Sequence, residues 1–180
     1  MRRGESRRIA LCGVMGALAV VVMLMGSVIP VATFCAPLIS SVLMLVVAIE
    51  HGVKTAMLLY LAVSLLALIL VPDREMAMVF VFCLGYYPML KAYLEKLHLA
   101  LVRWAGKLAV FNGAIMAMYA VLLYIFPIQA LVDEFEETGK GFVVVLLALG
   151  NLAFVIYDRA LEVLAQLYMV KLRPMLSHRI

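Results

Sequence analysis

Two polar side chains interrupt the apolar stretch LGNLAFVIYD at residues 149–158. Asn151 carries an amide and Asp158 a carboxylate, and both are costly inside a bilayer unless they are paired, reach the interface or face a cavity. Asn151 is far from any charged residue in the sequence. Its amide must therefore bond to a neighbouring helix or face a cavity, and the sequence favours neither role over the other.

Asp158 has a candidate partner on the preceding helix. With a rise of about 1.5 Å per residue, Asp158 lies about 24 Å and Asn112 about 22 Å from the outer ends of their helices. We expect a hydrogen bond between these two side chains, which would staple the helices at the cytoplasmic rim, and this role is favoured over one in transport. Lys107 and Arg159 are near enough in the sequence to pair with the carboxylate.

Aromatic residues lie near the estimated depth of Asn151, which is about 14 Å from the outer end of its helix. Pro88 cannot donate a backbone hydrogen bond, so the carbonyl near position 84 needs another donor or water. Aromatic walls with a few polar groups are typical of small-ligand pockets, so we expect a pocket among the fourth to sixth helices. The predicted substrate-binding residues are Asn151, Tyr119, Tyr86 and Tyr87, with Arg74 and Glu75 at the mouth.

No catalytic, metal-binding or cofactor-binding residues are predicted. The three histidines fall in expected inner loops or the tail, and the three cysteines have no C-x-x-C spacing. The sequence contains neither an H-E-x-x-H motif nor a glycine-rich phosphate loop. One enzymatic alternative stays open, a small membrane enzyme that acts on lipid with Asp158 and Asn112 as its polar centre.

The composition places these residues in a membrane protein. Of 180 residues, 67% are hydrophobic and 14% charged, and the mean hydropathy is +1.13. Soluble domains have about 45–50% apolar and about 25% charged residues, so a soluble fold would lack polar surface. The first apolar stretch, about 20 residues long, exceeds a signal-peptide core and predicts a retained span. The net charge of +4 is explained by orientation in the bilayer, and no nucleic-acid partner is predicted.

The apolar stretches predict an all-α bundle of six transmembrane helices in a single domain, residues 1–180. We expect both termini in the cytoplasm of a bacterial cell, because all of the 15 Lys and Arg residues except Arg74 and Lys140 then lie inside. If the short second helix were instead part of a re-entrant loop, the basic segments that follow it would lie on the wrong side of the membrane. The acidic run DEFEETGK, residues 133–140, is expected in an outer loop. The predicted helices are 9–28, 37–49, 53–71, 76–97, 108–126 and 142–172.

Small residues gather on one face of the first helix. Gly13 and Ala17 are four residues apart and Gly16 is adjacent to that face, so another helix can approach closely. This approach is either packing within the chain's own bundle or docking of a separate membrane subunit.

The six spans, the length of about 180 residues, the short second helix and the GVMGA stretch of the first helix resemble the S component of an energy-coupling-factor (ECF) transporter. In that family's usual Ala-x-x-x-Ala pair, Gly13 here takes the first position and Ala17 the second. The resemblance implies a non-enzymatic substrate-capture subunit for a small vitamin-like solute, with a transmembrane coupling subunit and two ATPases as partners. The alternative is a structural or scaffolding protein of the bacterial cell envelope.

Overall fold

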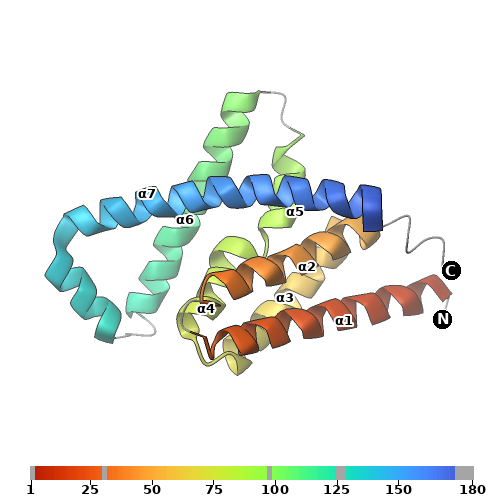
Figure 1. Cartoon of the computed structure of the whole chain (residues 1–180), viewed down its shortest axis with the longest axis horizontal. Coiled ribbons are helices and arrows are strands. Elements are labelled where there is room, and N and C mark those ends of the chain that lie inside the picture. Colours follow the sequence, from red (N-terminus) through yellow and green to blue (C-terminus); the bar gives the residue numbers. More distant parts are fainter. Residues whose placement is uncertain (1–2, 30–31, 97–98, 125–128, 173–180) are drawn as a thin grey trace.

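The computed structural model describes residues 3–29, 32–96, 99–124 and 129–172. All regular elements in these ranges are helical (Figure 1). The helices are α1 (Arg3–Gly26), α2 (Cys35–His51), α3 (Val53–Leu70), α4 (Arg74–Val79), the π-helix η2 (Phe80–Leu84), α5 (Tyr87–Leu94), α6 (Ala100–Tyr124), α7 (Gln129–Leu167) and the π-helix η3 (Tyr168–Leu172). The prediction of an all-α protein is confirmed.

Four segments within the described ranges are long and apolar enough to cross a membrane. One of them, Arg74–Leu94, combines α4, η2 and α5, and α2 is a shorter apolar helix. The other three are Glu5–Gly26, Val53–Leu70 and Ala100–Leu122. This agrees with a membrane protein, while the count of six spans and the cytoplasmic termini stay predictions.

Helices α1, α2 and α3 pack as one bundle with an apolar core. A Cβ added at Gly26 would come within 2.5 Å of the Ala36 Cβ, which shows how closely α1 and α2 approach. The Ser40 hydroxyl also joins these helices, because it donates to the Ala19 carbonyl oxygen over 3.0 Å. Gly52 alone separates α2 from α3, and its φ of 85° suits glycine better than any residue with a Cβ.

The break between α4 and α5 follows from local backbone chemistry. Within η2 the ladder widens, and the Gly85 N–H donates to the Phe80 carbonyl oxygen over 2.7 Å. Pro88 cannot donate to the Leu84 carbonyl, and the Tyr157 hydroxyl shares its proton between this carbonyl oxygen at 3.3 Å and Ser41 Oγ at 2.7 Å. The expectation that this carbonyl needs a donor from elsewhere is therefore confirmed, and the donor comes from α7.

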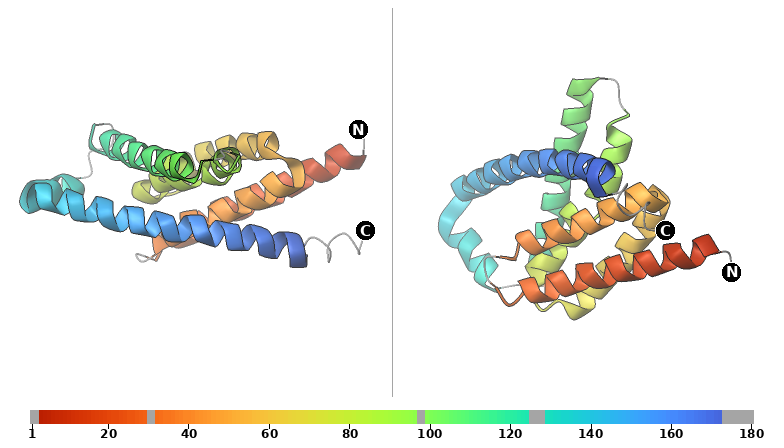
Figure 2. Two further views of the ribbon diagram at one scale, coloured as in Figure 1. Left: turned by 90° about the horizontal axis from the view of Figure 1, so that it is seen from above. Right: turned by 45° about the vertical axis from the view of Figure 1, so that its right-hand side comes forward.

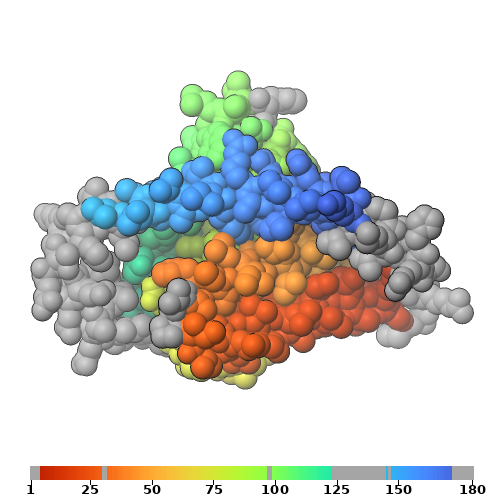
Figure 3. All heavy atoms as spheres, in the orientation of Figure 1, coloured from red at the N-terminus to blue at the C-terminus, as the bar shows by residue number. Residues whose placement is uncertain are grey.

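Helix α7 differs from the expected sixth helix at its start. It begins at Gln129, so residues 133–140 are helical and do not form the expected outer loop. Figure 2 shows α7 running along most of the length of the molecule, and Figure 3 shows it beside α2, with α1 on the far side of α2. Phe154, Tyr157 and Leu161 of α7 form a second apolar core with buried residues of α4, η2, α5 and α6.

Candidate functional site

Asp158 lies at the centre of a buried ionic cluster that joins three helices. Its side chain is 1% exposed, and Lys107 and Lys91 are 2% and 6% exposed. Lys107 Nζ lies 2.8 Å from Oδ1 and 2.9 Å from Oδ2, and Lys91 Nζ lies 2.7 Å from Oδ1. The Tyr87 hydroxyl donates to the same Oδ1 over 2.6 Å. One carboxylate therefore connects α5, α6 and α7.

Two partly exposed carboxylates surround this cluster. Glu95 Oε1 lies 3.4 Å from Lys91 Nζ and 3.8 Å from Lys107 Nζ, and Glu162 Oε1 lies 3.7 Å from Lys91 Nζ. Together the five side chains carry two positive and three negative formal charges. The buried ammonium groups are thus compensated from both sides, as ionised groups at low dielectric require.

Helical spacing presents these groups to one another. Tyr87, Lys91 and Glu95 recur every four residues along and just past α5, and residues at that spacing share a helix face. Asp158 and Glu162 have the same spacing on α7. Lys91 also donates to the Asp158 backbone carbonyl over 2.6 Å, which holds the side chains close to the α7 backbone.

Asn112 and Asn151 form a separate polar contact between α6 and α7. Each amide donates to the side-chain oxygen of the other over 3.0 Å. Each also donates to the carbonyl four residues earlier in its own helix, Leu108 at 2.9 Å and Leu147 at 2.8 Å. Of the two roles left open for Asn151, the structure shows the bond to a neighbouring helix.

The expected staple between Asn112 and Asp158 is therefore wrong in its pairing. Two lysine ammonium groups bind Asp158, and such charge-assisted hydrogen bonds are stronger than one from a neutral amide. The expectation that Lys107 pairs with Asp158 is confirmed. Arg159 instead pairs with Glu162 at 3.3 Å. The lipid-enzyme alternative required Asp158 and Asn112 in one polar centre, and the structure gives them separate partners.

An aromatic stack links the ionic cluster to the apolar interior. Tyr87 meets Phe154 edge-on, with ring centroids 4.9 Å apart at 72°. Phe154 in turn stacks on Phe111, with centroids 4.2 Å apart at 17°. The oxygen of Tyr87 thus binds the carboxylate, while its ring packs against the Phe154–Phe111 pair.

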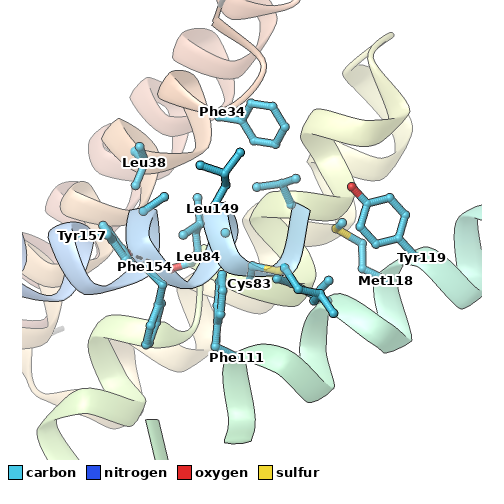
Figure 4. A pocket seen from close by; sticks show the side chains of 15 residues that line it. Phe34, Leu38, Cys83, Leu84, Phe111, Met118, Tyr119, Leu149, Phe154 and Tyr157 are labelled. Carbon is cyan, nitrogen blue, oxygen red and sulfur yellow. Dashed lines mark hydrogen bonds between the residues drawn. The ribbon is translucent and has the colours of Figure 1, made fainter. Parts of the chain in front are cut away.

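A cavity of about 330 Å³ lies beside this stack, between η2, α6 and α7 (Figure 4). Its wall is almost entirely apolar. The polar atoms of the wall come from Tyr119, Tyr157 and Cys83, and Tyr157 is already bonded to Ser41 and Leu84. The lining residues are Phe34, Leu38, Val79, Cys83, Leu84, Phe111, Ile115, Met118, Tyr119, Leu147, Leu149, Gly150, Ala153, Phe154 and Tyr157.

The predicted substrate-binding residues meet this cavity only in part. Tyr119 lies on its wall, whereas Asn151, Tyr86 and Tyr87 are not among the described lining residues. Tyr86 meets Tyr60 edge-on, with ring centroids 6.2 Å apart. Arg74 and Glu75 lie at the start of α4, and Arg74 donates to the Leu68 carbonyl there. Neither residue contributes to the described lining.

Most of the residues that form the site are not predicted from the sequence. The sequence predicts no role for Phe111 or Phe154, and it places Lys91 at the cytoplasmic end of the predicted helix 76–97. The four-residue spacing of Tyr87, Lys91 and Glu95 was the available signal for a polar face on α5. No comparable signal marks the two phenylalanines.

The predicted docking residues Gly13, Gly16 and Ala17 lie in an open groove between α1 and α3. A Cβ added at Gly13 would meet no atom within 4 Å, whereas one at Gly16 would come within 3.0 Å of Leu59 Cδ1. Gly16 therefore serves packing against α3 within the chain, while Gly13 borders open space. Of the two roles considered for this face, the structure shows packing within the chain at Gly16, and docking of a separate subunit stays a prediction.

Within the described ranges, no three His, Cys, Asp or Glu side chains form a group that could hold a metal ion. Comparison of the chain with protein-family models, with curated proteins and with solved structures finds no match. The function is therefore inferred from the geometry of the chain itself.

Proposed function

We propose that this chain is a substrate-capture subunit of the bacterial cell membrane, of the kind found as S components in ECF importers. It binds a small vitamin-like solute in the cavity between η2, α6 and α7 and has no enzymatic activity of its own. In this proposal six helices span the membrane with both termini in the cytoplasm.

The observation that carries the proposal is the cavity. Its volume of about 330 Å³ is in the range of small-molecule sites, which measure about 300–1,000 Å³. The expected position of a ligand site, among the fourth to sixth predicted helices, supports the same function. Tyr119 belongs both to the predicted site and to the cavity wall.

The groove beside α1 supports the proposal that a second membrane protein binds here. Gly13, Ala17 and Ala62 leave room along the groove for the close approach of another helix. A coupling subunit, itself driven by two ATPases, would pack on this groove. It would respond to whether a solute is bound in the cavity.

Affinity purification from native membranes tests the partner. The parent chain is expected to recover a large membrane subunit together with two ATPases, and Gly13→Leu is expected to lose them because its side chain fills the groove. Gly113→Leu is the matched control, since a Cβ at Gly113 also meets no atom within 4 Å but lies on α6. If both variants recovered the membrane subunit and the ATPases equally well, the groove would not be the surface that binds them.

A scaffolding protein of the bacterial cell envelope is the second candidate. It is favoured by the ionic cluster and the amide pair, which hold α5, α6 and α7 together without contributing a charged group to the cavity wall. This function predicts recovery with cell-wall synthesis proteins and no retained solute. Native mass spectrometry of gently extracted protein separates the two candidates, because only the first predicts a bound small molecule.

A further inference from the structure

The wall of the cavity contains no charged side chain among the described residues. A charged solute would have to leave water without any group of opposite charge to receive it, and burial of an unpaired charge is strongly unfavourable. The chemistry of the wall therefore selects against ionised ligands.

The charged residue that is nearest in sequence to the cavity wall already forms ion pairs. Asp158 follows the lining residue Tyr157 directly, but its carboxylate binds Lys91, Lys107 and Tyr87 and is 1% exposed. The Tyr87 ring also packs against Phe154, which belongs to the wall. A ligand in the cavity thus meets the apolar faces of this stack, while the cluster lies behind them.

Aromatic rings supply much of the surface that a ligand would touch. Five of the fifteen lining residues are aromatic, a share that favours flat partners, because ring pairs gain energy from stacked or edge-on contacts beyond the area they bury. Figure 4 shows rings at several sides of the cavity, with Phe34 from the N-terminal side of α2, Tyr119 and Phe111 from α6, and Phe154 from α7.

We infer that the cavity takes an uncharged, flat aromatic molecule, held between the ring of Phe34 and the stacked pair of Phe111 and Phe154. The inference rests on the proposed function, since it names the class of solute that this site captures. Tyr119, Cys83 and Tyr157 supply the polar side-chain atoms of the wall that a neutral heteroatom of such a ligand would meet. A lipid acyl chain is the competing occupant, and it has no ring.

Photolabelling of the full chain in lipid nanodiscs tests the inference. The probe is 1-azidonaphthalene, and the competitors are naphthalene, naphthalene-2-sulfonate and decane at equal concentrations. Label on residues 111–119 of α6 is expected to fall about tenfold with naphthalene and to change little with the sulfonate, because the described lining of the cavity offers no cation. Label on the exposed α3 residues Leu58, Leu61 and Leu65 is the internal control for probe dissolved in lipid.

A matched pair of variants on α7 locates the site. Ala153 lines the cavity, whereas Ala160 lies two helical turns further along the same face and does not line it. Ala153→Phe is expected to abolish the naphthalene-sensitive label, and Ala160→Phe to retain it.

The outcomes separate this inference from the proposed function. If naphthalene-2-sulfonate or decane competed as well as naphthalene, the assignment of an uncharged aromatic ligand would be wrong, but a ligand site would remain. Naphthalene that lowers the α3 label as much as the α6 label, or leaves both unchanged, removes the cavity as a ligand site, and the proposed function then fails with it.

Discussion

The two halves of the molecule are held together by different physical means. In the half formed by α1, α2 and α3, closely approaching backbones and methionine, alanine and valine side chains make up the core. In the half formed by α5, α6 and α7, a buried ionic cluster and an amide pair connect the helices. The first half therefore depends on the volumes of its side chains, and the second on completed polar pairs.

This difference matters because the two kinds of contact fail differently. A packed interface loses energy gradually when a side chain changes size. A buried ionic cluster loses much more when one partner is removed, since the remaining charges are left unpaired. Substitutions that change side-chain size in one half and remove a polar partner in the other should therefore have different effects on stability.

The largest effect is expected for Asp158→Ala. It leaves Lys91 and Lys107 buried without their carboxylate, so stability should fall by about 3–5 kcal/mol, measured as thermal unfolding in detergent. Glu162→Gln is the control and should cost at most about 1 kcal/mol, because Glu162 is partly exposed.

A triple replacement sharpens the same test. Asp158→Leu combined with Lys91→Met and Lys107→Met removes all three buried charges, and such replacements are often neutral or stabilising. If the triple variant were as unstable as Asp158→Ala, side-chain packing rather than unpaired charge would explain the loss.

Gly26→Ala should have the largest effect in the first half, about 1–3 kcal/mol. Its Cβ would lie 2.5 Å from the Ala36 Cβ, and neither atom can rotate away, so α1 and α2 must separate. Gly13→Ala is the control, since its Cβ meets nothing within 4 Å. Equal unfolding temperatures for the two variants would show that α1 and α2 are not closely packed.

Tyr157→Phe should cost about 1 kcal/mol, because Ser41 Oγ and the Leu84 carbonyl then lose the hydroxyl proton that they share. Chemical denaturation in mixed micelles would measure the change. Tyr93→Phe on the exposed side of α5 is the comparison, with an expected change near zero. If Tyr157→Phe were as stable as the parent chain, these two acceptors would have another donor.

The smallest effect is expected between Asn112 and Asn151. A double-mutant cycle with Asn112→Leu and Asn151→Leu should give a coupling free energy near 0.6 kcal/mol, on the order of measured polar contacts in membranes. A coupling free energy of zero would show that the two amides act independently.

Much of the fold could be predicted because helical periodicity and apolar length are local properties. The need of the Leu84 carbonyl for a donor also followed from one residue, Pro88. The pairing of Asn112 could not be predicted in the same way. Depth along a helix was estimated as if α6 and α7 stood upright, whereas they are inclined to one another (Figure 1). When two helices are inclined, the residues that meet across them differ by whole helical turns from the pairs that equal depth predicts.

The ionic cluster shows a second limit of the sequence. The sequence predicts Lys91 at the cytoplasmic end of the helix 76–97, because lysine usually marks the end of a span. Its position on α5 with Tyr87 and Glu95 is visible in the spacing, but its contact with Asp158, 67 residues later, depends on how α5 lies beside α7. Contacts of this kind are set by tertiary arrangement, which no local pattern encodes.

The joint at Gly52 has a mechanical consequence. One residue between α2 and α3, with its amide donating to the Ala48 carbonyl over 3.0 Å, leaves no slack for the two helices to slide apart. Helix α1 packs closely against them. The wall of the cavity beside Phe154 comes mostly from α6 and α7, so a movement of these two helices would change the shape of the cavity most.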